Sequence, residues 1–404
     1  MATSRSSSED RIISLGPDSV GIPERLLLAH ARGEVLFICG AGISLPANLP
    51  DFRQLVLDVY AVLDVGAHAV LSRIPAGICN LWEIDCRTLT DQQTAEVRRF
   101  IVGDYDVVLG MLERRLDNRP SGDSRVRNAI AMRLRTTGIK PAPIHRALIR
   151  LADRGGTTTI ITTNFDLLLE AAAKGIADRL QTYSLGAIPR PTHRKDFSGV
   201  LHIHGALDRS PKRYSELVLS DRDFGEFYLR RRVVPDFIYD AARLYNLVLV
   251  GYSANDPPMR YLLNAVAADG TRFSDLKERF TFFGGRTTDA VVLEDWRARG
   301  ITPIYYDSRA NHSVLLGTLE RWASLSATNG SRSRLDREIR RLVRRSRVAA
   351  HETDRDLFDH LIRRSNSSER VRISRLASDA GADIDWLDAI VRVSAETDHA
   401  STLR

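Results

Sequence analysis

Residues that can do chemistry follow three short apolar runs of this 404-residue chain. Gly40-Ala41-Gly42 follows the run at 35–39, Asn164 and Asp166 follow the run at 157–161, and His204 follows the run at 200–203. Glycines at such a turn let backbone amides approach a phosphate, and the N-terminus of a following helix favours negative charge. An asparagine amide both donates and accepts hydrogen bonds, and an imidazole titrates near neutrality, so it can accept a proton.

Each of these features also has a purely structural interpretation. The Gly40-Ala41-Gly42 turn lacks the third glycine of the usual dinucleotide fingerprint, because Leu45 occupies that position, and a tight turn without a ligand would look the same. An asparagine and an aspartate after a strand often cap a helix. His202 and His204 would point to the same side of an ideal strand, so alternation alone does not choose between them.

The elements that position these residues predict an α/β fold. The runs at 35–39, 157–161, 200–205, 247–250, 280–283 and 301–306 are short, apolar or β-branched, as expected for strands buried on both faces. They alternate with helical stretches, which indicates a Rossmann-like parallel sheet with covered faces. Ligands of such sheets bind at the carboxyl edge, where the polar residues follow the strands.

Changes in composition and in the spacing of apolar residues divide the chain into three parts. Residues 1–20 are rich in serine and are expected to be a flexible arm. Residues 21–327 are expected to form the α/β domain that carries these candidate residues, with a helical insertion at about 55–140. Residues 328–404 are expected to form a helical, basic C-terminal domain, because eight arginines occur in 332–347 while apolar residues keep a helical spacing.

The segment from Gly40 to Arg53 strongly resembles the opening motif of the sirtuins, Gly-Ala-Gly-x-Ser followed by Gly-Ile-Pro-Asp-Phe-Arg. Asn48 and Leu49 replace the Gly-Ile pair. Further segments match the family in the same order and extend the resemblance over about 30–325. They are Pro143–Leu148, Thr162–Asp166 with Thr163 in place of the family's glutamine, His204–Leu207, which matches the segment that carries the sirtuin general base, and Gly251–Ser253.

The resemblance implies NAD as substrate and assigns roles to the matching residues. Asn164 would orient the ribose or the attacking water, His204 would accept a proton, and Asp166 would contact the ribose hydroxyls or the cationic sugar. The remaining candidate NAD contacts are Gly40, Ala41, Gly42, Ser44, Asp51, Phe52, Arg53, Thr163, Gly251, Ser253 and Asp256. His202 is interpreted as structural, His145 as a packed helix residue and His312 as a helix cap.

Departures from the deacetylase pattern point to another branch of the family. Sirtuin deacetylases carry a four-cysteine zinc ribbon, whereas residues 206–246 contain no cysteine, and no metal is expected. The run Tyr252–Pro257 resembles bacterial sirtuin-like antiphage defence proteins, which hydrolyse NAD. This resemblance implies an NAD glycohydrolase (NADase) that forms a homo-oligomer. The length and the helical tail match the set that works with a hexameric HerA-type ATPase.

Composition excludes several other classes. Three cysteines cannot form a disulfide framework or a four-thiolate zinc site, and no apolar run reaches the roughly 20 residues of a membrane span. No secretory signal is visible, so a cytoplasmic location is expected. Only five of the 58 basic residues are lysines, and the net charge is +7. This arginine bias reflects either a GC-rich genome or phosphate contact, including nucleic-acid binding by the C-terminal basic helix.

Two alternative functions stay open at this point. The chain could be a binding module that senses NAD or ADP-ribose, with the basic tail contacting nucleic acid or a partner. It could also be a deacylase or an ADP-ribosyltransferase, although the missing zinc cysteines count against the deacylase.

Overall fold

The computed structural model describes residues 11–76, 84–117, 124–135, 138–175, 180–185, 188–189, 197–207, 216–251, 263, 266, 276–328 and 330–402. Two compact units make up the chain. Unit 1 comprises residues 1–35, 150–156 and 278–404, and unit 2 comprises 36–149 and 157–277. Each unit is described separately below.

Unit 2 contains a parallel sheet built from the predicted buried runs. Its strands follow the order β5-β6-β4-β3-β7. The bounds are β3 Val35–Cys39, β4 Thr159–Thr162, β5 Gln181–Tyr183, β6 Gly199–His202 and β7 Asn246–Val250. The pairs β3/β4, β4/β6 and β5/β6 are parallel, and every residue of β3, β4, β6 and β7 is buried. The predicted α/β class with a Rossmann-like parallel sheet is therefore confirmed.

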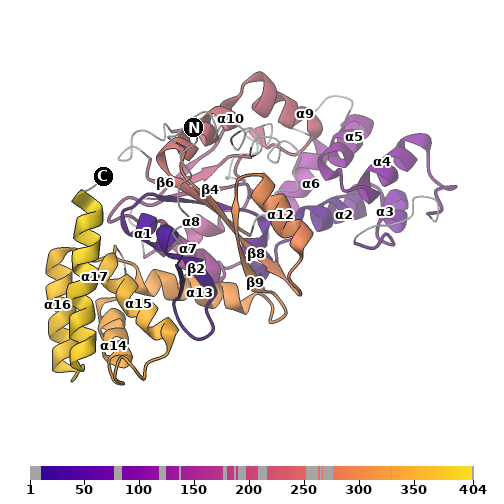
Figure 1. Ribbon diagram of the computed structural model, residues 1–404. Coiled ribbons are helices and arrows are strands. Elements are labelled where there is room, and N and C mark those ends of the chain that lie inside the picture. The colour runs from indigo at the N-terminus through magenta and orange to yellow at the C-terminus, as the bar shows by residue number, and fades with distance from the viewer. Residues whose placement is uncertain are drawn as a thin grey trace, which may run out of the picture. The chain divides into compact units, whose positions relative to one another are not determined.

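A group of five helices in unit 2 occupies the region where helical spacing predicts them (Figure 1). They are α2 Phe52–Leu63, α3 Val65–Leu71, α4 Asp91–Ile101, α5 Tyr105–Asp117 and α6 Arg125–Leu134. Side chains of Asp51, Asp64, Thr90 and Ser124 cap four of these helices, and their apolar faces share one core that includes Tyr60 and Phe100. The other described helices of this unit include α8 Leu168–Ala173, α9 Asp221–Phe224, the π-helix Gly225–Arg230 and α10 Val233–Leu244. Helix α7 spans Pro143–Ala152 and continues from unit 2 into unit 1.

Unit 1 combines two small strand pairs with helices. β1 Ile12–Ser14 and β2 Gly21–Pro23 pair antiparallel, and β8 Arg279–Gly285 and β9 Thr302–Asp307 pair parallel. The helices are α1 Glu24–Ala31, α12 Ala290–Ala298, α13 Ser313–Leu325, α14 Arg332–Leu342, α15 Glu352–Arg363, α16 Ser367–Asp379 and α17 Ile384–Thr402. Ile13 is fully buried within β1, so residues 12–14 of the predicted arm are an ordered strand.

The C-terminal helices pack around one aromatic pair. Trp386 of α17 is fully buried and its ring lies 4.7 Å, edge to face, from that of Phe358 on α15. Its indole N–H donates to the backbone oxygen of Arg345 at 2.8 Å. Among the described residues, no helix is long and apolar enough to cross a membrane.

Candidate functional site

The carboxyl ends of β3, β4, β6 and β7 are joined by backbone hydrogen bonds. Gly40 N–H donates to Val250 O at 3.0 Å, Thr163 N–H donates to Cys39 O at 3.0 Å, and Ile203 N–H donates to Thr162 O at 3.0 Å. These bonds bring the residues after the four strands to one edge of the sheet, where the sequence predicts the site.

Ser44 and Asn164 form the centre of this edge. The Asn164 Nδ2 donates to Gly40 O at 3.2 Å and to Ser44 Oγ at 3.1 Å. Both side chains are buried, with exposed fractions of 9% for Asn164 and 3% for Ser44. Because Nδ2 faces a backbone carbonyl, which only accepts, the amide orientation is fixed. The Oδ1 atom of the same amide has no hydrogen-bond partner among the described residues.

Two more side chains complete the bonding of Ser44. Its hydroxyl donates to Asp166 Oδ2 at 3.0 Å, and its Oγ lies 3.4 Å from His145 Nε2. His145 Nδ1 accepts from the Ala142 N–H at 3.1 Å, so the neutral ring carries its proton on Nε2 and donates to Ser44. Burial lowers the pKa of His145, while the Asp166 carboxylate opposes this shift. Ser44 thus has one donor and two acceptor positions in use and serves to orient Asn164.

Asp166 also has a structural task. Its Oδ1 accepts from the Leu168 N–H at 3.0 Å, in the first turn of α8. One oxygen of this carboxylate thus binds a free amide at the start of α8, although the N-cap position itself is Leu167 and has no side-chain cap, and Ser44 occupies the other oxygen.

His202 forms a hydrogen bond with the backbone of Asn164. Its Nδ1–H donates to Asn164 O at 2.7 Å, and its Nε2 lies 2.9 Å from Glu170 Oε1. Burial lowers the pKa of His202, but the Glu170 carboxylate and the two hydrogen bonds outweigh burial, so the net pKa is raised. Because both nitrogens face acceptors, the protonated form of His202 is favoured, and its Nδ1–H positions the backbone of Asn164. Its structural interpretation from the sequence is confirmed.

His204 lies in an aromatic environment. β6 ends at His202 and residues 203–204 form a turn, so strand alternation does not apply to this pair. The His204 Nε2 lies 2.7 Å from the Tyr228 hydroxyl, and its ring contacts the Phe224 and Tyr228 rings edge to face. Burial lowers the pKa of His204 to about 3, so the imidazole is neutral at physiological pH.

The glycine turn is packed against the end of β7. Gly42 N–H donates to Gly251 O at 2.8 Å, and a Cβ on Gly42 would lie 2.8 Å from Gly251 Cα. Gly251 has φ +63°, a conformation that favours glycine. The amides of Ile43 and Ser44 donate to Gly40 O and Ala41 O. Of the amides from Gly40 to Ser44, the Ala41 N–H is therefore the one left without a partner among the described residues.

Of the remaining candidates, Thr163 lies at the sheet edge, Asp51, Phe52 and Arg53 make contacts within the helical group of unit 2, and two lie outside the described residues. Asp51 caps α2 by accepting from Gln54 N–H, and Phe52 packs edge to face on Tyr105. Arg53 donates to Ile74 O at 2.5 Å and stacks over Phe100 at 5.1 Å. The Thr163 hydroxyl lies 3.4 Å from Cys39 O. Ser253 and Asp256 are outside the described residues.

Two contributing residues, Glu170 and Tyr228, were not singled out from the sequence, and a third has a contact that its predicted role did not include. His145, predicted as a packed helix residue, is buried on α7 as expected but also reaches Ser44, while Glu170 pairs with His202 and Tyr228 bonds His204. His312 precedes α13, but its side chain caps nothing; its Nδ1 lies 2.8 Å from the Tyr306 hydroxyl instead. Among the described residues, no group of three or more His, Cys, Asp or Glu side chains could hold a metal ion.

Residues 158–304 match the family model of the SIR2-like domain. This region of the chain is therefore similar to sirtuin-like proteins. It contains Asn164, His202 and His204, and the structure joins it to the glycine turn at 40–44, which lies before the matched region.

A curated relative and a solved structure were also compared. "Uncharacterized protein y4cA" from Sinorhizobium fredii (strain NBRC 101917 / NGR234) is 34% identical over 325 residues, which cover 78% of this chain and 24% of that protein. The chain thus spans about a quarter of the length of this relative. The structure described as "Structural Basis for the Mechanism and Regulation of Sir2 Enzymes" covers 74% of this chain and 96% of its own at 17% identity. Its TM-score is 0.38.

Proposed function

We propose that this chain is an NAD glycohydrolase that converts NAD and water into nicotinamide and ADP-ribose. The observation that carries the proposal is the position of Asn164, fixed by Gly40 O, Ser44 and His202 at the carboxyl edge of the sheet. The similarity of residues 158–304 to the SIR2-like domain supports NAD as the ligand of this edge.

The proposed reaction breaks the bond between ribose C1′ and the nicotinamide nitrogen. Both electrons of that bond go to the nitrogen, and the sugar gains oxocarbenium character before water adds at C1′ and releases a proton. Asn164 Nδ2 is used within the protein, so Oδ1 is the atom that would accept from a ribose hydroxyl or from the water. Asp166 would stabilise the positive charge on the sugar through its carboxylate.

Other parts of the edge would hold the rest of the dinucleotide. The Ala41 N–H is free among the described residues and would donate to a pyrophosphate oxygen. Gly40, Gly42 and Gly251 would shape the turn beneath it, and Ser44 would act through Asn164. Contacts from Thr163, Ser253 and Asp256 stay predictions, as do contacts from Asp51, Phe52 and Arg53.

One observation favours a second candidate function, an NAD or ADP-ribose sensor. A histidine whose pKa is lowered to about 3 by burial is a weak base, and His204 also bonds Tyr228. The chain in this state is better suited to binding than to proton abstraction. An enzyme with such a site would turn over only after a partner or assembly rearranges His204.

The biological setting that we propose is NAD depletion during bacterial antiviral defence. It rests on the resemblance of Tyr252–Pro257 to defence proteins and includes a cytoplasmic homo-oligomer and a HerA-type ATPase partner. Exposed arginines on α14 and in the turn that follows it, such as Arg340 and Arg344, offer a surface for nucleic acid or for an acidic partner.

The decisive experiment follows nicotinamide and ADP-ribose after the full chain is mixed with NAD, with and without the ATPase. Asn164→Ala should lower turnover at least about 100-fold while the fold is retained. The matched control is Asn128→Ala, an exposed asparagine on α6, which should leave turnover unchanged. Saturable NAD binding without product under every condition would favour the sensor, and covalent label from NAD on protein would indicate a transferase.

A further inference from the structure

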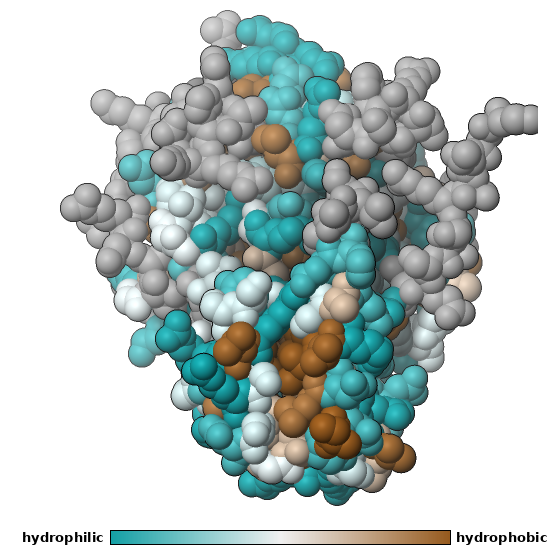
Figure 2. All heavy atoms as spheres, turned by 60° about the vertical axis from the view of Figure 1, so that its left-hand side comes forward, coloured by the Kyte–Doolittle hydropathy of each residue, from teal (hydrophilic) through white to brown (hydrophobic). Residues whose placement is uncertain are grey.

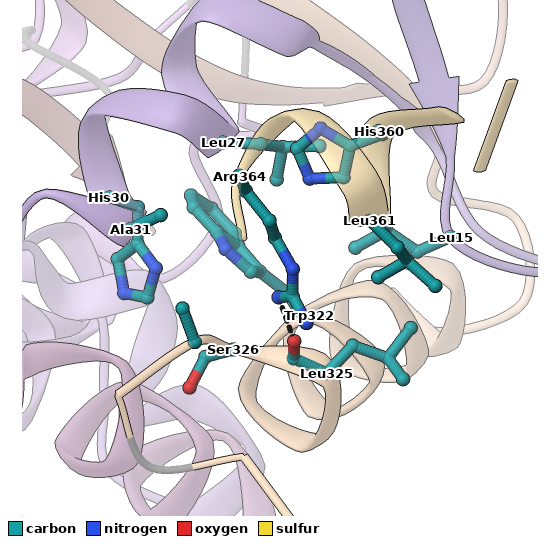
Figure 3. Close-up of a pocket in the computed structure, with 11 residues that line it drawn as sticks. Leu15, Leu27, His30, Ala31, Trp322, Leu325, Ser326, His360, Leu361 and Arg364 are labelled. Atoms are coloured by element: carbon teal, nitrogen blue, oxygen red, sulfur yellow. Dashed lines mark hydrogen bonds between the residues drawn. The ribbon is translucent and has the colours of Figure 1, made fainter. Parts of the chain in front are cut away.

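A small cavity lies inside unit 1, between α1, α13 and α15. His30, Trp322, Leu325, His360, Leu361 and Arg364 are among its lining residues (Figure 3). Its free volume is about 10 Å³, which is room for one water molecule or one ion of similar size. The lining joins residues 15–31 to residues 322–364 of the sequence.

Arg364 directs unused donors at this cavity. Figure 3 shows its guanidinium among the lining side chains, with Nη1 donating to Leu325 O. Nε and Nη2 are buried and have no hydrogen-bond partner among the described residues. The N–H bonds of these two nitrogens lie on one edge of the planar group and point the same way, so they can grip a single acceptor together.

The neighbouring groups do not neutralise this cation. Glu24 bonds the lining residue His360, and its Oε1 accepts from His360 Nδ1 at 3.0 Å and from Arg363 Nε at 2.7 Å. Glu369 favours the charged form of Arg364 through space, whereas Arg372 opposes it. Burial lowers the pKa of Arg364 to about 10, so the guanidinium still carries its charge at neutral pH.

The two histidines of the lining add no negative charge. Burial lowers the pKa of His30 to about 4, the hydrogen bond to Leu151 O opposes this, and the Arg364 and Arg154 charges lower it further. Burial also lowers the pKa of His360, while its bond to Glu24 opposes the shift. Both rings are therefore mainly neutral at pH 7, and the cavity keeps a net positive charge from Arg364.

We propose that this cavity is a binding site for one small inorganic anion of about the size of chloride, held by Nε–H and Nη2–H of Arg364. A water molecule would satisfy the hydrogen bonds but would leave the buried charge without a counter-ion. Phosphate and carboxylate ligands exceed the volume. The bound anion fastens α15 against α1 and α13 and stabilises unit 1 by mass action.

The first test compares thermal unfolding of the full chain in sodium chloride and in sodium gluconate at equal ionic strength. Gluconate is too large for the cavity. The melting temperature of the unchanged protein should be about 1–3 °C higher in chloride, and this difference should saturate with concentration. Arg364→Gln should abolish the difference.

A matched variant distinguishes the effect of losing the anion site from the effect of losing any arginine. Arg370→Gln removes an arginine of α16 that pairs with Asp398 at 2.9 Å, so it should keep the chloride difference. A chloride difference that persists in Arg364→Gln would overturn the proposal.

The second test needs no variant. Crystals of the full chain soaked in sodium bromide should show an anomalous peak beside Arg364 Nε and Nη2. A peak there that lacks anomalous signal is a water, and it would overturn the proposal even if the variants fail to fold.

Discussion

His202 is a buried residue that positions the site through its hydrogen bonds to Asn164 O and Glu170 Oε1. Its folded pKa is raised above the unfolded value of about 6.5, so its contribution to stability is complete below that value and is lost as the pH rises through the folded pKa. Removing the partner charge should therefore matter most at low pH.

We expect Glu170→Gln to lower the free energy of unfolding by about 1–3 kcal/mol at pH 6, and by less at pH 9. Urea unfolding at both pH values measures this. Thr182→Val is the control, because Thr182 donates to the same Glu170 oxygen at 2.8 Å but carries no charge. An equal loss at both pH values would show that His202 is not a cation.

His204 should have the opposite pH dependence. Burial lowers its pKa to about 3, so the unfolded chain binds a proton below about pH 6.5 that the folded chain does not. The free energy of unfolding should then decrease as the pH is lowered from about 6.5 to 3, by up to about 1.4 kcal/mol per pH unit. In His204→Gln the free energy of unfolding should depend less steeply on pH. Parallel curves for His204→Gln would contradict the neutral, buried imidazole.

The sequence is enough to predict site residues that come at the end of a strand. It does not predict the residues from distant segments that contact them. Asn164 and His202 are recognisable because each stands at the end of a buried run. His145 and Tyr228 meet Ser44 and His204 only through contacts between distant segments. Neither residue type nor spacing encodes that contact.

Contacts between elements set the shape of the glycine turn. Gly42 and Gly251 follow β3 and β7, and their backbones touch so closely that a Cβ on Gly42 would overlap Gly251 Cα at 2.8 Å. We expect Gly42→Ala to lower the free energy of unfolding by about 1–3 kcal/mol and to reduce nicotinamide release.

The matched glycine for this prediction is Gly225 in the π-helix. A Cβ there would meet nothing within 4 Å, and φ is −56°, so Gly225→Ala should be tolerated. Denaturant unfolding and the NAD assay measure both variants. Full stability of Gly42→Ala would mean that the two turns separate more easily than their hydrogen bond implies.

Buried elements are the predictable part of the fold. β3, β4, β6 and β7 were foreseen because burial on both faces leaves a continuous apolar run. β5 was missed because Gln181 and Thr182 are exposed at the end of the strand order, and β1 was missed because three residues are too few for a periodic signal.

At the scale of the whole chain, segments that are distant in the sequence contact one another in ways that local composition does not predict. The predicted division into 1–20, 21–327 and 328–404 stays a prediction, whereas compactness groups α14–α17 with the N-terminal residues in unit 1. Glu24 of α1 bonds His360 and Arg363 of α15, and Arg321 of α13 pairs with Glu338 of α14 at 2.5 Å. These ion pairs link residues up to 339 positions apart, so no local sequence pattern predicts them.

The surface of the C-terminal helices bears on the proposed homo-oligomer. Figure 2 shows apolar side chains gathered among polar ones on one face of the molecule. Ile384 and Val391 are 75% and 69% exposed on α17, and their spacing of seven residues places them on one face of this helix. Clustered exposed apolar residues mark interaction surfaces more often than scattered ones do.

If α17 mediates assembly of identical chains, charges on this face should separate them. We expect the double variant Ile384→Asp, Val391→Asp to have a smaller native mass by light scattering while its circular dichroism is unchanged, because a carboxylate buried at an interface loses its hydration without gaining a partner. Val62→Asp is the control, since Val62 is 71% exposed on α2, outside unit 1. An unchanged mass in the double variant would place the contacts between chains elsewhere, and a smaller mass in both variants would mean that the charge acts without regard to its position.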